Sequence, residues 1–195
     1  LVGSEMCIRD RFKGRDYLLQ YLFFPMAWLN IYKRVFLVEN QLEFKTGIYF
    51  EDNEFTPRAL YLAQKVCVTS SPFYYYRIRS GSLAQQIFGS KKMEDSMLVA
   101  NYLLEFSNCR VKEKKMRGYF AERALSIFFG TLGFFLQNHF VNKEQEREIN
   151  LLLRRVSLLT DLPFHFRSML LFHRITLRGM LYVVKKRYKY KYFQS

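Results

Sequence analysis

The chain has 195 residues, of which half are apolar and 18% are aromatic, a composition that excludes a disordered chain and allows one large or two small domains. Its formal net charge of +14 implies an anionic partner: nucleic acid, anionic lipid or a phosphate-bearing substrate. Cys7, Cys67 and Cys109 are far apart and show no metal-binding spacing. This argues against a disulfide framework or a zinc site and favours a reducing cytoplasm.

The first residues form an unusual segment. Leu1 to Asp10 reads LVGSEMCIRD, which resembles the translation of a transposase-type sequencing adapter. Arg11 is expected to share a codon with its end. The alternative is a genuine N-terminal segment. We treat residues 1–11 as an artefactual segment and exclude them from the functional argument, as one excludes a tag.

The next segment combines apolar and basic residues. An apolar run from Phe12 to Phe24 predicts a helix, and Pro25 ends it. Beyond Pro25, the spacing predicts that Trp28, Ile31 and Phe36 share one helical face, with Trp28 as a buried anchor. A helical turn is then expected over Val35–Glu39, with Asn40 as its stop.

Two adjacent acids follow a short β-type run. Ile48–Phe50 predicts a strand that delivers Glu51 and Asp52 to the start of a helix, which continues over Phe55–Lys65 with Pro57 in its first turn. Carboxylates at a helix start face its exposed N–H groups and its positive end. Such an acid is either a structural cap or a general base, and this pattern alone leaves both readings open.

A strand-rich stretch comes next. Val66–Thr69 predicts a short strand, a turn follows, and the aromatic run Phe73–Ile78 predicts a second strand. The polar loop that follows contains Arg79, Gly81 and Ser82. Arg and Gly in a loop suit the binding of oxyanions, because Arg donates two parallel hydrogen bonds and Gly lets backbone N–H groups approach.

The rest of the chain shows helical periodicity only. The expected helices are Met93–Phe106, Lys112–His139, Lys143–Leu159 and Phe164–Tyr182. The longest uncharged run, Ala124–Asn142, just reaches the length of a membrane span, but its polar residues favour a core helix of a bundle. Arg174–Ser195 alternates basic and aromatic residues, which favours an anionic membrane surface over a solvated tail or nucleic acid.

Three motifs occur in order: Ala27-Trp28-x-x-Ile31-Tyr32-Lys33-Arg34, Gly47-x-x-x-Glu51-Asp52-x-x-Phe55 and Tyr74-Tyr75-Tyr76-Arg77-x-Arg79-x-Gly81-Ser82. In their order and spacing they resemble the second half of bacterial family 2 glycosyltransferases, which build capsular and other exopolysaccharides. The resemblance covers about Phe12 to Gln86. It implies an α/β fragment, the C-terminal part of a GT-A domain over residues 12–90, followed by an all-α, basic, membrane-associating domain over residues 91–195.

The resemblance also implies roles for individual residues. Asp52 would be the base that deprotonates the acceptor hydroxyl, with Glu51 orienting it or contacting the acceptor. Trp28 and Tyr32 would shape the acceptor side, since sugar rings pack on aromatic faces. The loop that closes over the donor diphosphate would be formed by Arg77, Arg79 and Ser82.

The resemblance further implies a nucleotide-sugar donor, a saccharide or lipid-linked acceptor, and inversion at the transferred sugar. The complete enzyme is expected to use Mg²⁺ or Mn²⁺ held by an Asp-x-Asp motif in its first half. No Asp-x-Asp occurs in these 195 residues, so this fragment is expected to bind no metal and to be inactive alone. The expected location is cytoplasmic, peripheral on the inner face of the cell membrane.

Two other functions stay open from the sequence. One is a noncatalytic, basic helical module that binds a membrane or a partner, with Glu51 and Asp52 as helix caps only. The other is nucleic-acid binding, suggested by the net charge. Nucleic acid is the less favoured partner, because the charge is spread along the chain and no recognition motif accompanies it.

Overall fold

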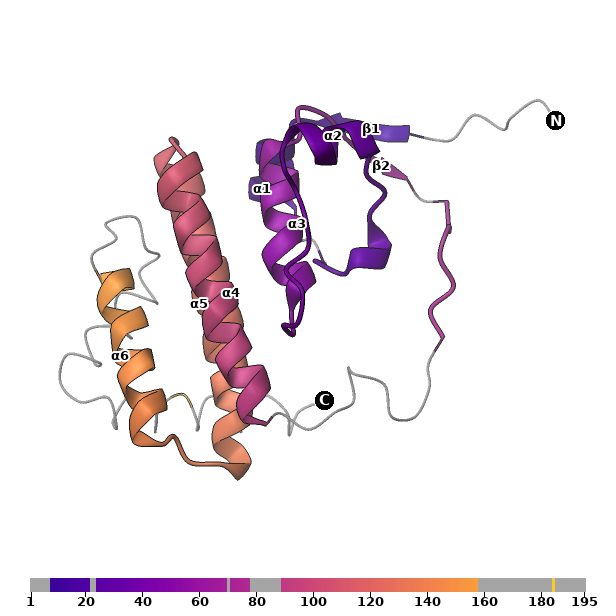
Figure 1. Cartoon of the computed structure of the whole chain (residues 1–195). Coiled ribbons are helices and arrows are strands. Elements are labelled where there is room, and N and C mark those ends of the chain that lie inside the picture. Colours follow the sequence, from indigo (N-terminus) through magenta and orange to yellow (C-terminus); the bar gives the residue numbers. More distant parts are fainter. Residues whose placement is uncertain (1–7, 22–23, 70, 78–88, 158–183, 185–195) are drawn as a thin grey trace. The chain divides into compact units, whose positions relative to one another are not determined.

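The computed structural model describes residues 8–21, 24–69, 71–77, 89–157 and 184. This part of the chain is mostly helical and contains one two-stranded sheet. The chain divides into two compact units, one formed by Leu1–Lys45 with Asp52–Gln86 and the other by Thr46–Glu51 with Ile87–Ser195. Each unit has its own buried side chains, and Figure 1 shows the elements of both.

The sheet of the first unit pairs β1 (Ile8–Phe12) with β2 (Val66–Thr69) in antiparallel orientation. The register places Phe12 opposite Val66, and an irregularity lies between Ile8 and Asp10. The predicted strand at Val66–Thr69 is confirmed. Its partner was not predicted, because most of β1 lies within residues 1–11, the segment that resembles translated adapter.

The aromatic run after β2 does not form the second strand that we predicted from its composition. Residues 72–77 are neither helix nor strand. Tyr74 and Tyr76 both stack on the Trp28 ring, at centroid distances of 6.0 and 5.2 Å, while Tyr75 between them is 97% exposed. The alternation expected of an extended chain is therefore present. Tyr74 and Tyr76 contact the Trp28 ring, and among the described residues no strand pairs with this segment.

The first helices are shorter than the sequence suggested. α1 (Gly14–Gln20) ends before the predicted boundary at Phe24. Residues Ala27–Leu29 form a single 3-10 turn, η1, and Asn30 then returns to extended backbone with φ −128° and ψ 140°. The predicted helical face of Trp28, Ile31 and Phe36 is therefore wrong, and Ile31 is 78% exposed.

α2 (Arg34–Glu39) matches the predicted helical turn, and Asn40 ends it as expected. The Asn40 side chain donates a 2.9 Å hydrogen bond from Nδ2 to the Phe36 carbonyl, which also accepts the Asn40 backbone N–H at 3.2 Å. Phe36 itself packs against the hydrophobic core of the first unit. Phe36, which the sequence predicted to lie on the same face as Trp28, thus belongs to the core around Phe55.

That core is built on α3 (Glu51–Leu62), in which Phe55 and Ala59 are each 1% exposed and pack with Leu42. The Phe55 ring stacks on Phe44 at 4.0 Å. The helix begins at Glu51, as predicted, but Pro57 lies in the helix interior and not in its first turn. A proline there removes one backbone donor from the helix, a cost that the burial around Phe55 has to offset.

The second unit is helical over its described residues. α4 (Ser90–Arg110) and α5 (Lys114–Asn138) are joined by the short connection Val111–Glu113 and pack side by side, and α4 also contacts α6 (Lys143–Ser157) (Figure 1). The predicted helices over Lys112–His139 and Lys143–Leu159 are confirmed within the described residues, and the predicted Met93–Phe106 is extended at both ends. Such long periodic segments carry the strongest sequence signal.

The start of α6 has a local cause. Asn142 Oδ1 accepts a 2.8 Å hydrogen bond from the Gln145 backbone N–H, and Gln145 Oε1 accepts a 3.1 Å bond from the Asn142 N–H. This reciprocal exchange is a capping box, which satisfies two backbone donors at a helix start. It explains why the helix begins directly after Asn142.

α5 is the core helix of this unit. Phe120, Phe128 and Leu132 have no exposed surface, and Phe135 is 2% exposed. The segment Lys114–Gln137 is also long and apolar enough to cross a membrane by length and composition, and 61% of its most apolar window is buried within the structure. That burial agrees with the core helix that we predicted for this run.

Other predictions fall on residues outside the described part of the chain. These are the helix Phe164–Tyr182, the basic and aromatic tail apart from Val184, and the loop residues Arg79 and Ser82.

We expect Tyr119→Phe to stabilise the second unit by about 1 kcal/mol. The Tyr119 hydroxyl is buried and has no hydrogen-bond partner among the described residues. Burial also raises the pKa of Tyr119 above its ordinary value of 10.0. Above pH 10 the unfolded chain therefore loses this proton before the folded chain does, and stability falls as the pH rises.

The variant should consequently lose less stability between pH 9 and pH 11 than the parent does, as measured by urea unfolding at each pH. Tyr75→Phe, at a position that is 97% exposed, is the matched control. It should change neither the free energy of unfolding at neutral pH nor the stability lost between pH 9 and pH 11. A Tyr119→Phe variant that is less stable than the parent at neutral pH would show that the hydroxyl is well hydrogen-bonded.

Candidate functional site

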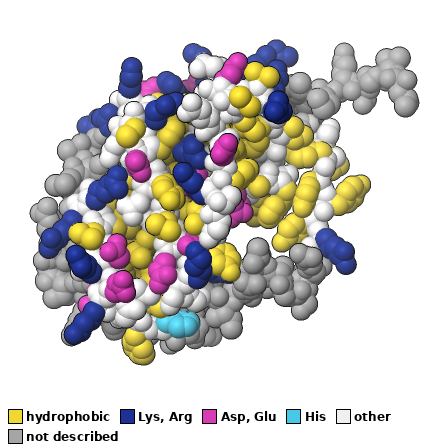
Figure 2. Space-filling view, viewed as in Figure 1, with side chains coloured by type: hydrophobic (Ala, Val, Ile, Leu, Met, Phe, Trp, Pro, Cys, Tyr) yellow, Lys and Arg dark blue, Asp and Glu magenta, His cyan; other side chains and the backbone are white. Residues whose placement is uncertain are grey.

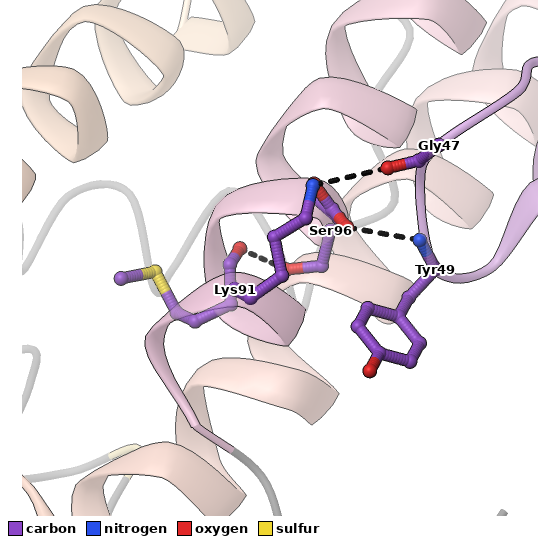
Figure 3. A network of polar contacts seen from close by, with 6 residues as sticks. Gly47, Tyr49, Lys91 and Ser96 are labelled. Atoms are coloured by element: carbon purple, nitrogen blue, oxygen red, sulfur yellow. Dashed lines mark hydrogen bonds and ion pairs between the residues drawn. The ribbon is translucent and has the colours of Figure 1, made fainter. Parts of the chain in front are cut away.

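The backbone before α3 forms a turn that side chains of α4 hold in place (Figure 3). Within this turn, Gly47 has φ +75° and Phe50 has φ +65°. The Tyr49 N–H donates a 2.9 Å hydrogen bond to Asp95 Oδ2. Lys91 Nζ lies 2.7 Å from Asp95 Oδ1 and 3.1 Å from the Gly47 carbonyl oxygen. The strand that we predicted over Ile48–Phe50 is therefore wrong, because these contacts fold the segment into a turn.

Glu51 and Asp52 are the first residues of α3, and both are partly exposed. Asp52 Oδ1 accepts a 2.9 Å hydrogen bond from Asn53 Nδ2. Carboxylates in this position benefit from the positive end of the helix and its unused N–H groups. A partly exposed carboxylate with one oriented oxygen has the chemistry to accept a proton from a ligand hydroxyl.

A third acid of the same helix has a different role. Glu54 is 1% exposed and lies 2.6 Å from Arg58 Nε and 2.7 Å from Arg58 Nη2, and Arg58 Nη2 also donates to the Glu43 carbonyl at 3.2 Å. This paired arrangement of a guanidinium and a carboxylate satisfies both charges. Glu54 therefore holds the helix and its preceding loop together, and it is Glu51 and Asp52 that reach the surface.

The structure separates the two aromatic residues assigned to the acceptor. Trp28 is partly exposed and stacks with Tyr74 and Tyr76. Tyr32 meets Phe55 edge-on at 5.4 Å and packs against the core of the first unit. Burial raises the pKa of Tyr32 above its ordinary value, with an opposing contribution from Thr56.

The aromatic surface formed by Trp28, Tyr74 and Tyr76 was only partly predicted. The sequence singled out Trp28 for the acceptor side, whereas Tyr74 and Tyr76 were considered only as members of the Tyr74-Tyr75-Tyr76 motif. Their alternate spacing was the signal that could have joined them, since residues two apart on an extended chain lie on the same side. Arg77, the first of the residues assigned to the donor loop, is exposed at the end of this segment.

The described residues do not fit the divalent metal expected for the complete enzyme. Within the described ranges, no group of at least three His, Cys, Asp or Glu side chains is close enough to hold a metal ion.

The charged surface is mixed in sign. Figure 2 shows Lys and Arg side chains interspersed with Asp and Glu over the viewed face, without a single basic patch. The net charge of +14 is thus not concentrated on that face of the described residues.

Comparison with known proteins adds no further assignment. No protein-family profile matches the chain, and neither the curated proteins nor the solved structures include a significant match to it.

Proposed function

We propose that this chain is the C-terminal portion of a family 2 glycosyltransferase of GT-A type. Such an enzyme transfers a sugar from a nucleotide-sugar to a saccharide or lipid-linked acceptor, with inversion, in the synthesis of a surface polysaccharide. The observation that carries the proposal is the position of Asp52, a partly exposed carboxylate in the first turn of α3. The order of the three motifs around it, which resemble those of that family, supplies the chemistry.

In the proposed reaction, Asp52 accepts the proton of an acceptor hydroxyl. The freed oxygen attacks the anomeric carbon of the donor sugar on the face opposite the diphosphate, a new glycosidic bond forms, and the bond from the anomeric carbon to the diphosphate oxygen breaks. The nucleoside diphosphate leaves with the bonding electrons, and the configuration inverts. Glu51 orients the base or the acceptor, and Arg77 with Arg79 and Ser82 offsets the charge of the leaving diphosphate.

The acceptor would pack on aromatic faces of the first unit. In this proposal Trp28, stacked with Tyr74 and Tyr76, supplies one such face, and Tyr32, which meets Phe55 edge-on, contributes separately to the acceptor side. The experiment is an assay of the complete protein for acceptor-dependent release of nucleoside diphosphate. A folded complete protein that releases none from any nucleotide-sugar would contradict the proposal.

The second candidate is a noncatalytic, basic helical module. It is favoured by α6, which buries Ile149 and Leu153 and carries exposed Arg154 and Arg155 in its last turn, whereas its first turn is acidic. Exposed basic residues attract anionic lipid. In this alternative Glu51 and Asp52 only cap α3, and their replacement changes stability but no activity.

Membrane association is a separate prediction of both candidates. We expect the chain to float with liposomes that contain anionic lipid and not with neutral ones, because the tail Lys185–Ser195 alternates basic and aromatic residues. Deleting that tail should lower the partition constant for anionic liposomes by more than about 100-fold at physiological ionic strength, since it removes several basic residues that each contribute roughly 1 kcal/mol near the surface. The control replaces the exposed Lys13 of the first unit by Gln and should leave flotation unchanged. Unchanged flotation after removal of the tail would show that the tail is not the anchor.

A further inference from the structure

We propose that Asp95 of α4 is a positioning residue for Glu51, acting through the turn that precedes it in the same unit. The inference rests on the proposed function for its catalytic consequence. The contacts that carry it are all within the second unit, which comprises both α4 and the segment Thr46–Glu51.

Asp95 is a buried acid, and both of its carboxylate oxygens have partners: one is the backbone of the turn and the other is Lys91. Its exposed fraction is 1%. Oδ1 pairs with Lys91 Nζ at 2.7 Å, and Oδ2 accepts the Tyr49 N–H at 2.9 Å. Hydrogen bonds to an ionised group are shorter and about twice as strong as neutral ones, and a buried charge that loses a partner is costly. The carboxylate therefore constrains the backbone at Tyr49 strongly.

Lys91 extends the constraint to the other end of the turn. Its Nζ donates to the Gly47 carbonyl at 3.1 Å as well as pairing with Asp95 (Figure 3). Lys92, the next residue of α4, places its Nζ 5.3 Å from the centre of the Tyr49 ring. One turn of α4 thus contacts the backbone of Gly47 and both the backbone and the ring of Tyr49.

The conformation of the turn requires such support. Phe50 has φ +65°, in the left-handed region that a bulky side chain rarely adopts. A residue in this region costs on the order of 1–3 kcal/mol and persists only where its surroundings determine it. The Asp95 contact, at Tyr49, lies directly before Phe50, the Lys91 contact lies at Gly47, and Glu51 follows Phe50 directly.

The consequence concerns the placement of Glu51. This residue directly follows Phe50, so the backbone conformation at Phe50 sets the direction in which the Glu51 side chain leaves the turn. A misplacement of about 1 Å at a catalytic group lowers the rate about 100-fold. Asp95 itself touches no substrate; it acts on Glu51, the residue proposed to orient the base or the acceptor, through the turn.

Hydrogen exchange at the Tyr49 amide tests the first step. Asp95→Ala removes the acceptor and should raise the exchange rate of this amide about 10- to 100-fold, the loss expected for a hydrogen bond to a charged group. Lys91→Met, at a side chain that is 59% exposed, leaves the acceptor in place and should have a smaller effect without unfolding the chain. Ser96→Ala is the matched control, because the Ser96 hydroxyl is buried on α4 but donates within the helix, to the Met93 carbonyl at 2.6 Å.

Kinetics of the complete enzyme test the second step. Asp95→Ala should lower kcat about 100-fold with little change in the acceptor KM. Asp95→Asn, which keeps an oxygen for the Tyr49 N–H, should recover part of that loss, whereas Ser96→Ala should keep the parent values. If the parent enzyme transfers sugar and Asp95→Ala keeps its kcat, the positioning role is wrong and the proposed function stands.

A different result identifies failure of the proposed function. If the folded parent protein transfers no sugar, that function is wrong and the positioning role falls with it. Unchanged exchange of the Tyr49 amide in Asp95→Ala would overturn the inference at its first step, whatever the assay of sugar transfer gives.

Discussion

Replacing Asp52 by Asn in the complete enzyme is expected to lower kcat for sugar transfer by about 10²–10⁴-fold, the usual contribution of a general base. The amide has nearly the shape of the carboxylate and can still occupy the first turn of α3, but it cannot take the proton of the acceptor hydroxyl. The acceptor KM should change little, because the lost interaction acts on the proton in the transition state. Steady-state release of nucleoside diphosphate at saturating acceptor measures the effect.

Asp16→Asn is the matched control for this variant. Asp16 is also an acid in the first turn of a helix, α1, and it is exposed. Both replacements remove a negative charge from a helix start, which costs about 0.3–1 kcal/mol of stability. Asp16→Asn should keep full turnover. If Asp52→Asn also keeps full turnover while it folds normally, Asp52 is a helix cap and not the base.

Replacing Gly14 by Ala is expected to lower the free energy of unfolding of the first unit by about 3 kcal/mol or more, at the upper end of the cost of overpacking. A Cβ at this position would lie 1.7 Å from the Leu60 carbonyl oxygen and 3.0 Å from that of Ala63. The Gly14 N–H also donates a 2.9 Å hydrogen bond to the Ala63 carbonyl. Because the obstructing atoms are backbone, α1 has to move away from the end of α3.

Gly89→Ala is the control, since a Cβ there meets no atom of the described residues within 4 Å. Urea unfolding should show a loss of less than about 1 kcal/mol for this variant, the size of a helix-cap effect. If Gly14→Ala unfolds at the same urea concentration as the parent, the close approach of α1 to Leu60 does not exist in solution.

Local sequence signals were sufficient for the helices of the second unit. α5 and α6 follow long periodic segments, and Asn142 marks the start of α6 through its capping box with Gln145. The start of α3 at Glu51 was also predictable, because acids are favoured in the first turn of a helix. In each case the cause lies within a few residues of the feature.

Features that depend on distant residues could not be predicted. The turn before α3 was mistaken for a strand, because its conformation depends on Asp95, 46 residues beyond Tyr49. The spacing of Lys91 and Asp95 is typical of an exposed helical ion pair, and nothing local indicates that Asp95 is buried. The segment Phe73–Ile78 has strand composition, but strand formation requires a partner, and β2 pairs with β1.

The candidate site also combines features that the sequence predicted with contacts that only the structure shows. The location of Glu51 and Asp52 followed from the sequence, whereas the pairing of Glu54 with Arg58, the stack of Trp28 on two tyrosines and the support from Asp95 required the structure. Their roles in sugar transfer rest on the resemblance of the motifs and stay a proposal.

The anomeric configuration of the first product tests the proposed sugar transfer most directly. The complete enzyme would be incubated with an α-linked nucleotide-sugar, such as UDP-glucose or UDP-N-acetylglucosamine, and a panel of saccharide and lipid-linked acceptors, and the new linkage would be read by NMR at early times. We expect a β-linkage whose formation is lost in Asp52→Asn. An α-linkage, or a β-linkage formed at the full rate by that variant, would contradict the role of Asp52 as the base of an inverting transfer.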